Sequence, residues 1–154
     1  MQLAEFLTPA AVIPHLKATT KKQALQCLAC YASDVIGAPE DTILSCLLER
    51  ERLGSTGVGG GVAIPHGKLE GVEGLVGVLG RLDQPIDFEA VDDKPVDVFF
   101  MLLAPPSAGA DHLKALACVS RLLRDETVVN SLRGADSAAA LYAIATAKPE
   151  PTAA

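Results

Sequence analysis

The sequence predicts an α/β fold, a single-domain sandwich in which helices flank a central mixed β-sheet. Three observations lead to this prediction. Helical patterns alternate with short apolar segments along 154 residues, a length suited to one hydrophobic core. Residues Val96–Leu103 are almost continuously apolar, which favours a central strand covered on both faces. A hairpin-like segment, Arg81–Phe88, lies between two candidate strands, so we expect some antiparallel pairing.

Apolar periodicity and helix-end signals predict five helices, at residues 20–36, from near 39 to 52, and at 111–124, 127–132 and 137–146. Thr20 is the expected cap of the first helix and Gly37 its end. Pro39 suits the first turn of the second helix. The apolar stripe expected on the third helix consists of Leu113, Leu116, Val119 and Leu123.

The expected strands are Val62–Ile64, Leu75–Leu82, Val96–Leu103 and a short one near Val12. We expect one domain over residues 1–147. Residues 148–154 contain two prolines that prevent continuation of the last helix, so a flexible C-terminal tail is predicted there.

Composition excludes several classes of function. Hydrophobic residues make up 49% and charged residues 21% of the chain, which is typical of a globular protein. Only 4% are aromatic and the net charge is -6, so nucleic-acid binding is not expected. No signal peptide or membrane-spanning stretch is recognisable, so we expect a cytoplasmic protein without membrane insertion.

The four cysteines are Cys27, Cys30, Cys46 and Cys118. Cys27 and Cys30 have the spacing of a redox or zinc pair, but they lie in a helical pattern with no second pair. We interpret all four as buried, inert thiols.

The glycine-rich segment Gly54–Lys68 holds the residue best suited to chemistry. It is not a P-loop, because Gly60 and Gly61 stand after Gly59 where that motif needs Lys and Ser or Thr. It is not a dinucleotide-binding fingerprint either, because it follows a helix and leads into a strand. Pro65 keeps the chain extended as it reaches His66, and Gly67 leaves room beside the ring. Neutral imidazole is nucleophilic near pH 7. On these local features alone, a turn histidine is the more common explanation and a nucleophile is the alternative.

The motif Leu-Gly-Ser-Thr-Gly-Val-Gly-Gly-Gly-Val-Ala-Ile-Pro-His-Gly-Lys, at 53–68, resembles the phosphorylation motif of the fructose/mannitol-type enzyme IIA proteins of the bacterial phosphotransferase system. The resemblance covers nearly the whole chain, and within the family it is strongest to the nitrogen-regulatory branch. It extends to the segments Leu47–Arg52, Gln84–Ala90, Lys94–Leu103 and His112–Leu116.

This resemblance implies roles for three residues. His66 corresponds to the histidine that accepts a phosphoryl group, at Nε2, and Arg50 to an arginine that steadies that group. His112 corresponds to a second active-site histidine that hydrogen-bonds the phosphoryl oxygens. Without the resemblance, Arg50 is interpreted as a solvated residue at a helix C-terminus and His112 as a surface residue.

Four more residues of the motif are candidates for binding, namely Ser55, Thr56, Gly67 and Lys68. Turn formation alone explains the hydroxyl residues equally well, and Lys68 is equally plausible as a solvent-facing side chain. His15 has no comparable motif around it. No cofactor and no metal are expected, since histidine-to-histidine transfer needs neither.

The resemblance implies a phosphotransferase with an HPr-like phosphocarrier as donor, which is itself charged by enzyme I. The phosphorylation state would regulate protein targets such as potassium-transport or sensor-kinase proteins. Two alternatives stay open. One is a sugar-specific IIA component that passes phosphate to a IIB domain, and the other is a non-catalytic interaction module on the same fold.

Overall fold

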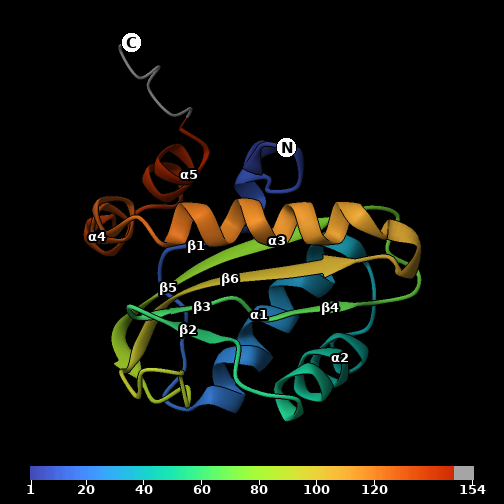
Figure 1. Cartoon of the computed structure of the whole chain (residues 1–154), viewed down its shortest axis with the longest axis horizontal. Coiled ribbons are helices and arrows are strands. Elements are labelled where there is room, and N and C mark those ends of the chain that lie inside the picture. The colour runs from blue at the N-terminus through green and yellow to red at the C-terminus, as the bar shows by residue number, and fades with distance from the viewer. Residues whose placement is uncertain (148–154) are drawn as a thin grey trace.

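The sheet is built around β6 (Val96–Ala104), which pairs antiparallel with β5 (Val76–Ile86) on one side. On its other side β6 pairs parallel with two short strands, β3 (Val62–Ala63) and β4 (His66–Lys68). β1 (Val12–Ile13) and β2 (Gly57–Gly59) complete the strand order β1-β5-β6-β3-β2. The computed structural model in Figure 1 describes residues 1–147, and the tail predicted at 148–154 lies outside the described residues.

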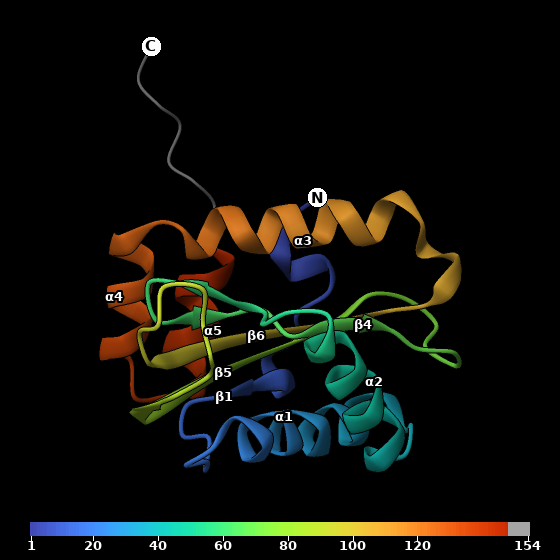
Figure 2. The ribbon, with the colours of Figure 1, turned by 60° about the horizontal axis from the view of Figure 1, so that its bottom comes forward.

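The helices lie on both faces of this sheet. Within the described residues they are α1 (Lys21–Ile36), α2 (Glu40–Arg52), α3 (Ala110–Leu123), α4 (Glu126–Gly134) and α5 (Ala138–Thr146). Figure 2 shows α1 and α2 below the sheet and α3 above it. The predicted mixed sheet flanked by helices is therefore confirmed. No helix among residues 1–147 combines the length and the apolar character needed to cross a membrane.

The ends of α1 follow from two residues. The Thr20 side chain accepts the Gln23 N–H at 3.2 Å, which satisfies one of the free donors of the first turn. Gly37 follows the last turn with φ 77°, a left-handed conformation that costs glycine little. The predicted cap and end of this helix are confirmed.

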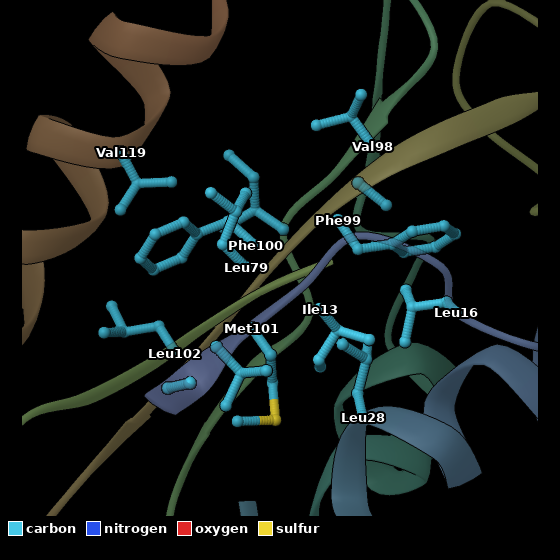
Figure 3. Close-up of a cluster of buried hydrophobic side chains, with 14 of the residues drawn as sticks. Ile13, Leu16, Leu28, Leu79, Val98, Phe99, Phe100, Met101, Leu102 and Val119 are labelled. Atoms are coloured by element: carbon cyan, nitrogen blue, oxygen red, sulfur yellow. The ribbon is translucent and has the colours of Figure 1, made fainter. Parts of the chain in front are cut away.

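Alternate side chains of β6 face opposite layers. Phe100 meets Phe6 edge-on at 6.0 Å between ring centroids. Figure 3 shows Phe100 and Leu102 turned toward Val119 of α3, whereas Met101 lies on the side of Leu28 of α1. Because both faces are covered, this strand reads as a continuous apolar run rather than as an alternating pattern.

The hairpin-like reading of Arg81–Phe88 is wrong. β5 continues to Ile86, and the chain reverses only between Ile86 and Val96, although the pairing of β5 with β6 is antiparallel as expected. The short strands β2 and β4 were not predicted, because three residues of glycine-rich sequence carry no periodicity.

The prediction that all four cysteines are buried is wrong for Cys30, which is exposed, and the other three are half-buried. All four are free thiols. Cys30 lies on the outer side of α1, where the two-residue spacing from Cys27 places the pair one helical turn apart.

Candidate functional site

His66 is the first residue of β4, which runs beside the end of β6. Pro65 has no N–H and separates β3 from β4, while its carbonyl accepts the Leu102 N–H at 2.9 Å. The preceding Ile64 carbonyl oxygen lies 2.7 Å from His66 Nδ1. Because a carbonyl can only accept, Nδ1 carries the proton and Nε2 keeps its lone pair. The break between the two strands thus supplies the acceptor that orients the ring.

Arg50, in the last turn of α2, reaches this lone pair. Its Nε donates to His66 Nε2 at 3.3 Å, and its Nη1 donates to the Gly54 carbonyl at 2.9 Å. The second bond fixes the guanidinium across the end of the helix. A permanently charged, planar group beside an unprotonated imidazole nitrogen is well suited to binding anionic oxygens.

His112 lies in the first turn of α3 and approaches His66 from the other helical layer. The two ring centroids are 5.9 Å apart, at 71° between the planes. Only 7% of His112 is exposed, and its Nε2 has no hydrogen-bond partner within the described part of the chain. The structure therefore brings together all three residues proposed for the phosphoryl site, from α2, β4 and α3.

The apolar stripe expected on α3 is wrong at Leu113, which is 70% exposed. The buried positions of this helix are His112, Ala115, Val119 and Leu123, at helical spacing. His112 occupies the buried position that the sequence pattern assigned to Leu113, so the leucine side chain is turned outward.

The three side chains line a shallow depression of about 380 Å³. Its full lining is Cys46, Glu49, Arg50, Leu53, His66, Gly67, Lys68 and His112. Leu53 is 84% exposed and adds apolar surface to this lining. Sequence reasoning missed Cys46, Glu49 and Leu53, although together with Arg50 they have the i, i+3, i+4, i+7 spacing of one helix face.

The surroundings of both histidines favour the neutral form of the imidazole. Burial lowers the pKa of the His66 imidazole, and the Arg50 charge lowers it further, while the bond to Ile64 acts in the opposite sense. Burial also lowers the pKa of His112, with the His66 ring and the Lys68 ammonium adding to this effect. A neutral His66 retains the lone pair that a nucleophile requires.

Gly67 and Lys68, two of the candidate binding residues, belong to this depression. A Cβ on Gly67 would lie 2.5 Å from the Cys46 sulfur, so the absence of a side chain lets α2 pack against β4. The Cys46 thiol in turn donates to the Lys68 carbonyl at 3.3 Å. Gly67 thus sets the distance between the strand of His66 and the helix of Arg50.

Ser55 and Thr56, the other two candidates, do not line the depression. The Ser55 hydroxyl donates to the Phe88 carbonyl at 3.0 Å, and the Thr56 hydroxyl donates to the Glu51 carboxylate. Both hydroxyls therefore hold the loop between α2 and β2. His15 is exposed and pairs with Asp83 at 3.1 Å.

A second hollow, of about 800 Å³, lies between the β2–β3 turn and α3 and α4, and it shares no lining residue with the first. Its Arg133 is already bound to Asp97 at 2.9 Å and to the Gly60 carbonyl at 2.7 Å. No cluster of three or more histidine, cysteine or acidic residues suited to a metal occurs among residues 1–147. The depression around His66 is therefore the better candidate for an active site, because two histidines and Arg50 line it.

The family described as "Phosphoenolpyruvate-dependent sugar phosphotransferase system, EIIA 2" matches residues 5–148. The chain belongs to this EIIA 2 family. A relative named "Nitrogen regulatory protein", from Bradyrhizobium diazoefficiens, is 51% identical over 149 residues, covering 97% of each chain. A "PTS system fructose-specific EIIA component" from Haloferax volcanii is 41% identical to this EIIA 2 chain over 119 residues, covering 77% of each.

Solved structures agree with the family assignment. The crystal structure of nitrogen regulatory protein IIA-Ntr from Neisseria meningitidis superposes on this EIIA 2 chain with a TM-score of 0.88 and 33% identity. The match covers 94% of this chain and 99% of the other. Fold and sequence thus place the chain in the same family as proteins named for nitrogen regulation.

Proposed function

We propose that the chain is a phosphocarrier in which His66 Nε2 accepts a phosphoryl group from the phosphohistidine of an HPr-like protein. The observation that carries the proposal is the bond from Nδ1 to the Ile64 carbonyl at 2.7 Å, which directs the lone pair of Nε2 into an open depression. Arg50 and His112 beside it would bind the oxygens of the incoming group.

The transfer needs no proton donor from this chain. The His66 Nε2 lone pair forms the new N–P bond as the N–P bond of the donor breaks, and the electron pair of that bond returns to the donor ring. The donor leaves as neutral imidazole when its other nitrogen is protonated. His66 keeps its Nδ1 proton, because the hydrogen bond to Ile64 stabilises the positive charge that the phosphorylated ring gains.

Docking would be helped by two exposed leucines, Leu53 in the lining of the depression and Leu113 next to His112 in the sequence. Leu53 follows the last turn of α2 and Leu113 belongs to the first turn of α3, so one apolar side chain comes from each helical layer. Exposed apolar side chains around a polar centre are typical of surfaces that meet another protein.

The phosphorylation state of His66 would be read by regulated proteins, such as potassium-transport or sensor-kinase proteins, in the cytoplasm. The 51% identity to a protein named for nitrogen regulation supports this branch. A second candidate is a sugar-specific IIA component that passes phosphate to a IIB domain. The 41% identity to a fructose-specific EIIA component favours this alternative.

Incubation with phosphoenolpyruvate, enzyme I and an HPr-like carrier tests the proposal. The wild type should acquire an acid-labile, alkali-stable phosphate, and His66→Ala should acquire none. His15→Ala is the matched control, because this exposed histidine pairs only with Asp83 and should leave labelling unchanged. If the wild type remains unlabelled with every cognate carrier, the chain is an interaction module and the proposal is wrong.

A second experiment separates the two branches. The labelled protein is mixed with purified IIB domains for fructose and mannitol, and loss of label from His66 is followed over time. Rapid transfer to a IIB domain would favour sugar transport. Retention of the label, together with target binding that differs between labelled and unlabelled protein, would favour the regulatory role.

A further inference from the structure

Glu51 is a buried carboxylate next to Arg50 in the sequence, but it faces a different part of the fold. Only 6% of its side chain is exposed, and Lys21 pairs with it at 3.0 Å. The same carboxylate accepts the Thr56 N–H at 3.0 Å and the Thr56 hydroxyl. Such a buried charge is tolerated because an ion pair and two hydrogen bonds compensate for the lost contact with water.

The placement of Lys21 is unusual for a helix. It is the first residue of α1, where the helix dipole disfavours a cation. Its ammonium lies 4.8 Å from the centre of the Phe88 ring as well as against Glu51. The position is therefore explained by the carboxylate and the ring that it binds rather than by the stability of its own helix.

Thr56 connects this ion pair to the nucleophile. The Thr56 carbonyl accepts the Ile64 N–H at 2.9 Å, and the Ile64 carbonyl in turn accepts the proton of His66 Nδ1 at 2.7 Å. A continuous series of hydrogen bonds thus runs from Glu51 through two backbone segments to the imidazole. Thr56 is 3% exposed, so water does not compete for these bonds.

We propose that Glu51, held by Lys21 and acting through Thr56, is a positioning residue that fixes the orientation and tautomer of His66. The inference rests on the proposed phosphocarrier function. Glu51 itself does not line the depression, so it would not touch the phosphoryl group. Its neighbour Arg50 contacts Nε2 from the same helical turn, so one turn of α2 determines the surroundings of both ring nitrogens.

Two variants test the proposal at different points of the series. Glu51→Gln removes the charge, and Thr56→Val removes the hydroxyl while keeping Glu51 and Lys21 in place. In unphosphorylated protein, imidazole ¹⁵N shifts report the share of His66 rings protonated at Nδ1. We expect the wild type to hold almost only this tautomer and both variants to show a mixture. Phosphoryl transfer to Glu51→Gln should fall by roughly tenfold, which is less than the roughly hundredfold loss that a 1 Å misplacement of reacting groups can cause.

The pKa of His66 separates positioning from simple electrostatics. The Glu51 charge and the Ile64 hydrogen bond both raise the pKa of His66. Glu51→Gln removes the first and weakens the second, so the pKa should fall. Thr56→Val keeps the charge, so a lower pKa in that variant reports the loosened hydrogen bond alone. Thr56→Ser retains the hydroxyl and should restore wild-type behaviour.

Asp41→Asn is the matched control, an exposed carboxylate in the first turn of the same helix. It should leave tautomer, pKa and transfer rate unchanged. If Glu51→Gln fails to fold, Thr56→Val decides the question. Wild-type tautomer and rate in the folded variants would overturn the proposal. The tautomer is read without phosphate, so a wild type that accepts no phosphate would refute the proposed function and leave this measurement valid.

Discussion

Arg50 donates a hydrogen bond from Nε to Nε2 of His66, the nitrogen that would receive the phosphoryl group, at 3.3 Å. The guanidinium and an incoming phosphorus atom therefore compete for one lone pair. Because Nη1 is also held by the Gly54 carbonyl, a small rotation about the end of the side chain would move Nε from the nitrogen to the phosphoryl oxygens. Substitutions at Arg50, Gly67 and His112 and the titration of His66 therefore have distinct expected outcomes.

Replacement of Arg50 should separate charge from geometry. Arg50→Met should slow phosphoryl transfer by about a hundredfold, because a cationic donor to the transferring group is lost. Arg50→Lys should recover part of the rate, since a lysine provides the charge without the planar fork. The Arg50 charge lowers the pKa of His66, so Arg50→Met should raise it. Single-turnover labelling and NMR titration measure the two effects, and an unchanged rate in Arg50→Met would contradict the role.

Transfer should depend on pH through the neutral His66 ring. The pKa of His66 is lowered from its ordinary value of 6.5, chiefly by burial, so the acceptor stays active as the pH falls below 6.5 and loses activity only at its own lower pKa. A pH profile of single-turnover labelling, with the donor charged beforehand, checks this. A midpoint above 6.5 would show that burial does not control the titration.

Folding stability should follow the same two histidines. Both have a pKa lowered in the folded state, so the unfolded chain takes up protons first as the pH falls. Stability is therefore full above about pH 6.5 and declines as the pH approaches the lower folded values. Urea unfolding of the wild type and of His66→Ala at several pH values measures this. If the free energy of unfolding changes equally with pH in the two proteins, His66 does not contribute.

Gly67→Ala should destabilise the protein through contact with α2. Its Cβ would lie 2.5 Å from the Cys46 sulfur, and overpacking of this kind costs about 1–3 kcal/mol. In Gly67→Ala/Cys46→Ala the clash is relieved, so the loss should be smaller than the sum of the two single losses. This double-mutant cycle is measured by the urea midpoints of the wild type, Gly67→Ala, Cys46→Ala and the double variant. Additive losses would mean that α2 does not approach the strand as the geometry indicates.

His112→Leu should separate stability from activity. The buried Nε2 of His112 has no partner among residues 1–147, so an apolar replacement should stabilise the fold by roughly 1 kcal/mol. Phosphoryl transfer should fall because a donor to the phosphoryl oxygens is missing. Thermal unfolding tests the predicted gain in stability, and phosphate labelling of the same preparation tests the predicted loss of transfer. A destabilised but fully active variant would indicate a structural histidine.

Elements whose formation depends on neighbouring residues were predictable from the sequence. The Thr20 cap, the Gly37 end and the apolar run of β6 depend on residues close together in the chain, so their physical causes are visible in the sequence. β4 and the phase of α3 were not predictable. A three-residue strand is defined by the β6 edge that it pairs with, and Leu113 faces outward only because His112 fills the buried position.

At His66, the sequence by itself determined the residue type, the extended approach through Pro65 and the family motif, because these are properties of adjacent residues. Only the tertiary structure decided which ring nitrogen is free, since the Ile64 carbonyl is turned toward Nδ1 by the break between two strands. It also decided that Arg50 and His112 meet at His66. Hydrogen bonds and burial that join α2, β4 and α3 arise from packing across the sheet edge, which residue spacing does not encode.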